Sequence, residues 1–502
     1  MDKTPPPIVA NGNTFQLILV GGNLILVRGP TDTSVFMSVM RGADTLSTIL
    51  GETGLKKSTA FSSLKRLSET GAIDSRDNDG ERKWYSSAFR VLESTETVEE
   101  SLKPYFMESL FVRGDGSYKR LLTNAISLMA SFGVSISPIL DSMAIGIADR
   151  LYDQKYKETD AEEAIDICIR FLTDVDLARI ALLDHIPLKI GVELTTPMPH
   201  LSASIYVQFV LTILSSFATL CTGDPYCISS TEETGEGTYV ANLSPSIKKC
   251  PGSYGNNILK DMRITRNGDD QWIYLIDGDI KIVKEKPWMD IIDAVSIYPR
   301  DALSISKITG MPKATVLLNV RRMVNEGILT SVGKGKTSMY SLATTHSFTW
   351  KGVNLENTVD EDMELNLMIS DSDSFFLHMI SYIILRGDSL GIDVGPLLYN
   401  ISTIFADITM EHKKYTSIKD ALSSLQESDF KTLHVTSFLP FTLVFVSPKK
   451  LNRKVARVAS EFDVRYFSRL LEKITDMKYV LSESEVYGEN NENHKLVFRP
   501  AV

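Results

Sequence analysis

The stretch that decides the fold is Leu303-Ser-Ile-Ser-Lys-Ile-Thr-Gly310, followed at once by Met311-Pro-Lys-Ala-Thr-Val316. Its apolar spacing predicts a short helix that ends in a turn at Gly310, and then a longer helix. Pro312 suits the first turn of that helix, where a missing N–H costs nothing. The longer helix has an apolar face at helical spacing and ends before Gly327. That face consists of Val316, Leu317, Val320, Met323 and Val324.

The same pattern stands about 256 residues earlier in the chain. Matching residues recur in the same order at this nearly constant offset: Gly22 and Gly278, Gly54 and Gly310, Thr59 and Thr315, Lys65-Arg66 and Arg321-Arg322, Gly71 and Gly327, and Pro138 and Pro396. Chance does not produce such an ordered series, so we expect an internal duplication. The two halves are 13–248 and 271–502, and 249–270 is a linker rich in turn residues. Fused copies can pack as the subunits of a homodimer do, about a pseudo-two-fold axis.

In the first copy, 33–41 predicts a helix, 44–50 a short helix with Asp44 as its N-cap, and 55–67 a longer helix. The expected core stripe of the longer helix is Leu55, Ala60, Phe61, Leu64 and Leu67. Residues 72–75 and 82–86 predict the strands of a hairpin. This order of helix, short helix, turn, longer helix and hairpin resembles a winged helix-turn-helix. The resemblance implies that the first turn of the longer helix meets base edges in the major groove and that the wing reaches phosphate.

The resemblance assigns candidate DNA-binding residues to both copies. On the longer helices they are Lys56, Lys57, Ser58, Thr59, Ser62 and Lys65 in copy one, and Lys313, Thr315, Asn319 and Arg322 in copy two. On the wings they are Arg82, Lys83, Lys334 and Lys336. Winged helices also serve as protein–protein modules, so a protein-contacting or purely structural role is the alternative.

Charge separates the two copies. Residues 300–340 hold seven Lys and Arg against two Asp and Glu, whereas residues 44–90 hold eight against seven. A local basic patch is the electrostatic footprint of phosphate contact. We therefore expect copy two to bind DNA more strongly. Asp77, Asp79 and Glu81 lie in the first wing, where phosphates would be, which predicts a degenerate wing in copy one.

Behind each of these segments, the periodicity predicts a second, α+β module in the order helices, two strands, a long helix and two strands. This order resembles the 4-vinyl reductase domain, a small-molecule-binding module found beside winged helices in archaeal regulators. The resemblance covers 118–245 and 374–500. That family carries a cysteine near the last long helix and a second one in a hairpin, but the hairpins here, at 233–239 and 487–493, contain none. Two interpretations of each α+β module are therefore alternatives: it contains an apolar ligand pocket, or its core is filled and it serves only as a scaffold.

Composition excludes several classes of protein. The chain of 502 residues has 53 Lys and Arg against 63 Asp and Glu, a net charge of −10, so it does not coat nucleic acid over its whole surface. Its four cysteines cannot form a disulfide scaffold and are expected to be small buried residues in a reducing compartment.

The chain contains no Walker A loop, H-E-x-x-H or G-x-S-x-G motif, and its seven histidines are scattered singly. The apolar run 203–220 is interrupted by polar residues and predicts a core helix instead of a membrane span.

The fold class expected is therefore α+β, with two tandem copies of a winged helix-turn-helix followed by a helix-rich α+β module. The modules are 13–92, 104–248, 271–345 and 365–502. The function expected is a non-enzymatic, cytoplasmic, nucleoid-associated DNA-binding regulator or chromatin protein, without metal or cofactor. Its expected partners are double-stranded DNA, an apolar small ligand, and a second copy or the transcription machinery, but no membrane. The alternative is an interaction scaffold whose winged helices bind proteins.

Overall fold

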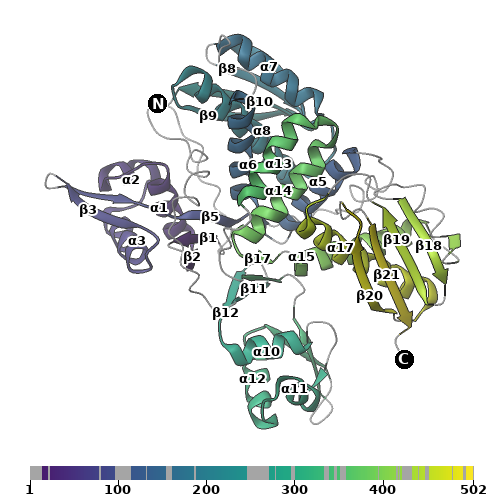
Figure 1. The fold of residues 1–502 in the computed structure, drawn as a ribbon. Helices are drawn as coiled ribbons and strands as arrows, with labels where there is room; N and C mark the ends of the chain where they lie inside the picture. Colours follow the sequence, from purple (N-terminus) through teal and green to yellow (C-terminus); the bar gives the residue numbers. More distant parts are fainter. Residues whose placement is uncertain are drawn as a thin grey trace.

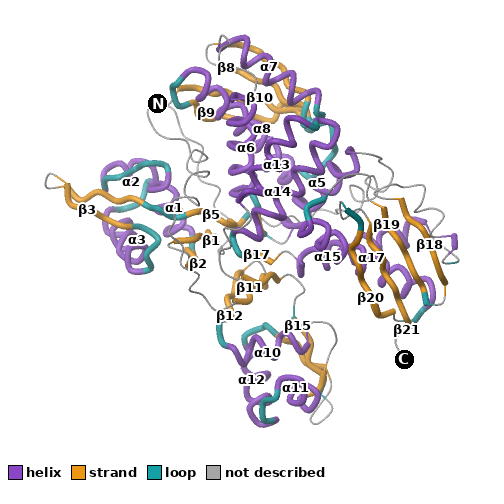
Figure 2. The backbone as a smooth tube through the Cα atoms, in the orientation of Figure 1, coloured by secondary structure: helices purple, strands orange, loops and turns teal. Residues whose placement is uncertain are grey.

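The structure is a computed structural model of the chain, and it describes most residues from Thr14 to Pro500. The described ranges are 14–20, 23–78, 81–95, 115–131, 133–153, 161–185, 188–245, 271–276, 279–295, 300–332, 338–343, 347–350, 358–393, 395–413, 417, 419–420, 432–438, 440–446, 451–477, 479–489 and 493–500. Within these ranges the protein is a mixed α+β molecule with several small antiparallel sheets. Figure 2 shows a central group of helices with most of the strands arranged around it.

The first three-helix module, residues 15–94, combines a hairpin, three helices, a second hairpin and a closing strand. Its elements are β1 (Phe15–Val20), β2 (Asn23–Arg28), α1 (Pro30–Met40), α2 (Leu46–Thr53), α3 (Lys57–Glu69), β3 (Asp74–Asn78), β4 (Glu81–Tyr85) and β5 (Phe89–Ser94). Strand β5 pairs with β1, so the chain returns to the sheet on which it started. A separate core forms among the three helices, with Val35, Phe36, Leu64 and Trp84 buried in it.

The second three-helix module, residues 271–350, has the same order of elements with one short strand, β13, added between its first two helices. They are β11 (Gln271–Ile276), β12 (Asp279–Val283), α10 (Lys286–Val295), β13 (Arg300–Asp301), α11 (Ala302–Thr309), α12 (Lys313–Asn325), β14 (Leu329–Val332), β15 (Met339–Leu342) and β16 (Ser347–Trp350). Strand β16 pairs with β11 as β5 pairs with β1. The two modules lie on different sides of the central helices (Figure 1).

The first central module, residues 115–245, supplies helices and a four-stranded sheet. Its elements are α5 (Asp115–Ser131), β6 (Val134–Ser135), α6 (Ser137–Leu151), α7 (Ala161–Asp174), β7 (Arg179–His185), β8 (Leu188–Glu193), α8 (His200–Thr222), β9 (Tyr226–Gly235) and β10 (Thr238–Pro245). The sheet order is β7-β8-β10-β9. The two strands that the sequence predicts before the long helix are β7 and β8.

The second central module, residues 358–500, contains a sheet of matching order, β18-β19-β21-β20. Its elements are α13 (Thr358–Ser370), a 3-10 turn (Ser372–Ser374), α14 (Phe375–Ser389), β17 (Ile392–Asp393), α15 (Gly395–Lys413), β18 (Thr432–Phe438), β19 (Phe441–Val446), α17 (Arg453–Thr475), β20 (Tyr479–Tyr487) and β21 (Asn493–Pro500). In both halves the long helix before the last hairpin runs for 23 residues.

A single hydrophobic core joins the two halves. It runs from β1 and β5 through α5, α6 and α8 to α13 and α14. Polar contacts cross the same boundary: Asp115 accepts hydrogen bonds from the backbone N–H groups of Phe376 and Leu377, at 2.9 and 3.1 Å. Asp115 on α5 therefore caps the first turn of α14, which has no side-chain cap of its own.

A buried ion pair reinforces this boundary. Arg386 Nη1 donates to Glu361 at 2.9 Å, and both side chains are almost fully buried. The same guanidinium donates to Ser142 of α6 at 3.0 Å and lies over the ring of Phe89 in β5. Burying two charges is costly unless each is paired and hydrogen-bonded. Here Glu361 and both terminal nitrogens of Arg386 have partners, whereas the Nε of Arg386 has none among the described residues. The pair therefore favours one packing arrangement of the halves.

Two of the expected module boundaries do not coincide with boundaries in the structure. The short strand β6 adds to the sheet of the first three-helix module, in the order β2-β1-β5-β6, although it follows the expected boundary at 104. Strand β17 adds in the same way to β12-β11-β16. Each three-helix module is thereby hydrogen-bonded to the helices behind it.

Local expectations are corrected at three points. The N-cap of α2 is Thr45 and not Asp44, because Thr45 and Thr48 exchange hydrogen bonds in a capping box. Phe61 is 51% exposed and is not a core residue, whereas Ser63 is fully buried. Cys227 is half-buried and disulfide-bonded, and not the small buried residue that was expected, while Cys168 and Cys221 are free.

Helix α8 is the one helix, within the described ranges, that is long and apolar enough to cross a membrane. It packs against α6 and α7, and 67% of its most apolar window is buried inside the protein. Tyr206 on this helix donates a hydrogen bond to the carbonyl of Leu177 at 3.1 Å. These contacts favour the core-helix interpretation.

We predict a pH-dependent effect at Asp141 on α6. Burial raises the pKa of Asp141 to about 6, although Arg90 nearby lowers it. Because the folded pKa lies above the unfolded one, the proton stabilises the fold below about pH 4, and this stabilisation is lost as the pH rises through about 6. Asp141→Asn does not titrate. From pH 4 to pH 7 its free energy of unfolding should therefore rise relative to wild type by up to about 3 kcal/mol.

Urea unfolding at a series of pH values measures this difference. Asp174→Asn, at an exposed position, controls for the loss of one negative charge. Parallel stability curves for wild type and Asp141→Asn would contradict the prediction.

Candidate nucleic-acid interface

The first candidate surface is the start of α3. Helix α2 ends at Gly54, whose φ of +65° lies in the left-handed region, and α3 begins three residues later. The N-cap residue Lys56 makes no side-chain capping bond, so the cap leaves the first-turn N–H groups without a side-chain acceptor. A helix N-terminus in this state attracts anions, because its N–H groups and its dipole both face outward. All the predicted residues of this helix are exposed: Lys56, Lys57, Ser58, Thr59, Ser62 and Lys65.

The opposite face of α3 is held against α1. Arg66 donates to both oxygens of Asp32, from Nε at 3.0 Å and from Nη2 at 2.6 Å. Ser63 also donates to Asp32. This bidentate contact fixes the rotation of α3 about its own axis. It turns Phe61 and Lys65 outward, which is why Phe61 is exposed although its helical spacing suggested a core position.

The start of α12 is built in the same way. Gly310 has a φ of +70°, the N-cap is Pro312, and no side-chain cap is present. Lys313 and Thr315 are exposed in the first turn, as predicted. Hydrogen bonds from Ser304, and to a lesser degree the charge of Lys313, lower the pKa of Asp301, the N-cap of α11. Positive charge at this turn is thus close enough to influence a neighbouring carboxylate.

Asn319 has a different role from the one expected. Its Oδ1 accepts a hydrogen bond from the indole Nε1 of Trp288, at 3.2 Å, so Asn319 connects α12 to α10. It occupies the position of Ser63, which connects α3 to α1. Arg322 is exposed and stands three residues further along, at the position of Arg66. By helical spacing, Arg321 and not Arg322 continues the exposed stripe of Lys313.

Arg321 is exposed and is a candidate that the sequence analysis missed. The spacing in the sequence indicates it, because Lys313 and Arg321 are eight residues apart, as the exposed Lys57 and Lys65 are in copy one. The Trp288 contact adds Asn319 to the packed face of α12, on which Val316, Val320 and Met323 are buried.

The first wing carries positive charges that are already paired. Arg82 lies 3.2 Å from Asp77 across the β3-β4 hairpin, and Lys83 lies 3.2 Å from Asp44. Carboxylates therefore compete with phosphate at both predicted wing residues. In copy two, the wing candidates Lys334 and Lys336 lie outside the described residues, whereas the strands β14 and β15 on either side are described.

The described residues hold no cluster of three or more His, Cys, Asp or Glu side chains that could bind a metal ion. Of the histidines among them, His378 is buried against Glu364 at 2.7 Å, and His200 lies 2.7 Å from Glu233. The Nε2 of His378 also lies 3.6 Å from Asp371, so this ring stands between two carboxylates. Compared with known proteins, the chain matches no family model, no curated protein and no solved structure.

We predict that Asn319→Ala weakens the fold and not the interface. Trp288 loses its acceptor, so the free energy of unfolding should fall by about 1 kcal/mol, the usual value of one hydrogen bond. DNA affinity, measured by fluorescence anisotropy on the folded variant, should stay at the wild-type level. Thr315→Ala, an exposed first-turn change, is the matched control. A loss of affinity in Asn319→Ala without a loss of stability would contradict the role in helix packing.

Proposed function

We propose that the protein is a DNA-binding regulator that contacts double-stranded DNA through two winged-helix modules, 15–94 and 271–350. The observation that carries this proposal is that the same arrangement occurs twice. In each module, a left-handed glycine is followed by an uncapped helix whose first turn exposes lysine and threonine. The opposite face of each helix is held against the first helix of its module, α3 against α1 and α12 against α10, which leaves the basic face outward.

The matching element orders support an internal duplication as the origin of this arrangement. The sheets β2-β1-β5-β6 and β12-β11-β16-β17 correspond, as do β7-β8-β10-β9 and β18-β19-β21-β20. Two unlike recognition helices on one chain would read two unlike half-sites, so the DNA site would not be palindromic. The spacing of the half-sites would be set by the helices between the modules.

The two copies are expected to contribute unequally. In copy one, Arg82 and Lys83 are paired with Asp77 and Asp44, so the wing adds little attraction for phosphate. Copy two has five more positive than negative residues between 300 and 340. Phosphate contacts supply most of the non-specific affinity for DNA. Copy two is therefore the stronger DNA-binding module in this proposal.

The test is fluorescence anisotropy with labelled genomic DNA fragments over a salt series. Each phosphate contact contributes about 0.9 to the slope of log affinity against log salt. Lys313→Ala/Arg321→Ala should reduce the magnitude of this slope by about 2, and Lys56→Ala/Lys57→Ala by less. Arg170→Ala/Lys189→Ala removes the same charge from exposed positions on α7 and β8 and should leave the slope unchanged.

Equal effects of all three double variants would mean that only net charge matters, which would contradict an interface at the helix starts. Wild-type binding weaker than ~10⁻⁴ M, the weak end of non-specific affinity, would also contradict the proposal.

A second function, a protein-binding scaffold, is favoured by one observation in the second three-helix module. Four large apolar side chains are exposed there, Leu303, Ile308, Leu318 and Met339, by 46%, 53%, 53% and 40%. At an offset of 256, copy one has polar residues at these positions: Ser47, Glu52, Ser62 and Lys83. Exposed apolar groups of this kind are typical of protein-contact surfaces. The second module would then bind a protein partner, such as the transcription machinery, in place of DNA.

Ile308→Glu/Leu318→Ser, which introduces the copy-one residues, separates the two functions. A scaffold loses protein binding in this variant, whereas a DNA-binding module keeps the wild-type salt slope.

A further inference from the structure

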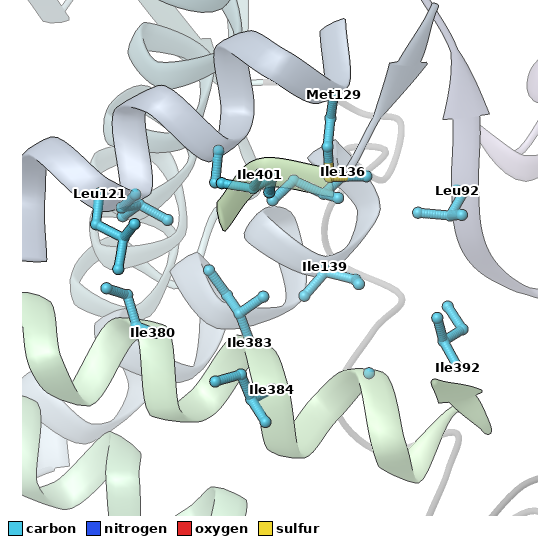
Figure 3. A pocket seen from close by; sticks show the side chains of 13 residues that line it. Leu92, Leu121, Met129, Ile136, Ile139, Ile380, Ile383, Ile384, Ile392 and Ile401 are labelled. Atoms are coloured by element: carbon cyan, nitrogen blue, oxygen red, sulfur yellow. The ribbon is translucent and has the colours of Figure 1, made fainter. Parts of the chain in front are cut away.

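A cavity lies between the two halves, where α5 of the first half crosses α14 of the second (Figure 3). Its volume is about 120 Å³. The walls come from α5, α6 and β5 on one side and from α14, α15 and β17 on the other. The side chains that line it are entirely apolar: isoleucine, leucine, methionine and alanine, with one glycine. The cavity therefore belongs to neither central module alone.

The lining has an internal correspondence at an offset of 258, the offset that relates Pro138 to Pro396. Three pairs of equivalent residues from α5 and α14 face the cavity: Leu122 and Ile380, Ala125 and Ile383, and Met129 and Gly387. The third pair is unequal, because the first half has a long side chain where the second half has none. The missing side chain at Gly387 accounts for space on one side of the crossing.

Gly387 also lowers the stability of α14 itself. A glycine inside a helix destabilises it by about 1 kcal/mol relative to alanine. The pocket is partly open, since Leu121, Met129 and Ile383 are only half-buried, and its lining atoms lack contacts on the side that faces it. A molecule that fills the void recovers those contacts.

The chemistry of the walls restricts the occupant. No donor or acceptor faces the cavity, so a polar or charged ligand would lose its hydrogen bonds to water without replacement. The described lining residues also offer an ordered water none of the polar partners that hold water in place. An apolar cavity of about 150 Å³ in another protein stays dry and binds benzene or xenon. We propose that this cavity binds a small, uncharged, nonpolar molecule of about the size of one benzene ring.

Because both halves supply the walls, the occupant contacts both at once. Binding should therefore stabilise the packing of α5 on α14 and raise the stability of the whole chain by mass action. This inference does not depend on DNA binding, so either proposal can fail without the other.

Benzene is the probe. Thermal unfolding of the full chain should shift to higher temperature with benzene concentration and then saturate, and phenol, which has the same ring with a hydroxyl group, should give a much smaller shift. The methyl resonance of Met129 in a methyl-labelled sample should move with the same concentration dependence, because the aromatic ring lies beside it.

Gly387→Met is the deciding variant, because it places at Gly387 the side chain that the first half carries at the equivalent position. It should fill the cavity and abolish the benzene shift while unfolding cooperatively. If this variant does not fold, Ile383→Ala takes its place: it enlarges the cavity and should change the preference from benzene to butylbenzene.

Three results would overturn the proposal. They are a shift that does not saturate, equal shifts with benzene and phenol, and a benzene shift that survives unchanged in a folded Gly387→Met.

Discussion

The packing of α5 against α14 is the contact on which the rest of the structure depends. Asp115 on α5 caps the first turn of α14, and Arg386 on α14 donates to Ser142 on α6 and to Glu361 on α13. The short strands β6 and β17 follow α5 and α14 directly and pair with β5 and β16. Trp350 in β16 also donates from its indole to the carbonyl of Leu390, just after α14. Each three-helix module is therefore attached to the central crossing by a strand.

This arrangement has a consequence for the proposed function. If both three-helix modules contact DNA, their separation is set by packed helices and paired strands and not by a flexible tether. Fixed separation selects for fixed half-site spacing. In this proposal the unequal charge of the two modules also fixes the orientation of the protein on its DNA site, because the more basic module contributes most of the affinity. The second module also exposes Leu303, Ile308, Leu318 and Met339, where the first module has polar residues at the equivalent positions.

Much of the fold could be predicted from residues that repeat. Gly54 and Gly310 end their helices in the left-handed conformation, as glycine at that position should. The first-turn lysines are exposed because α3 and α12 start directly after those turns. Periodicity predicted the existence of most elements. It failed where two neighbouring residues could both fill the same structural role. Thr45 and Asp44 can both cap a helix, and only the reciprocal bond with Thr48 decides between them.

Other features depend on contacts between distant residues, which local pattern does not contain. Phe61 is exposed because Asp32 fixes the rotation of α3 through Arg66, across 34 residues of sequence. Asn319 packs against α10 because a tryptophan occupies position 288, where copy one has Asp32. The cavity required the crossing of two helices more than 240 residues apart, so the sequence of either central module alone could not decide between a pocket and a filled core.

The most direct test of the shared core is size-exclusion chromatography of the protein after its chain has been cut within 249–270, at an inserted protease site. If α5 and α14 hold the halves together, the two fragments should elute as one particle at the position of the intact chain and separate only in denaturant. Fragments that elute separately in native buffer would contradict the account.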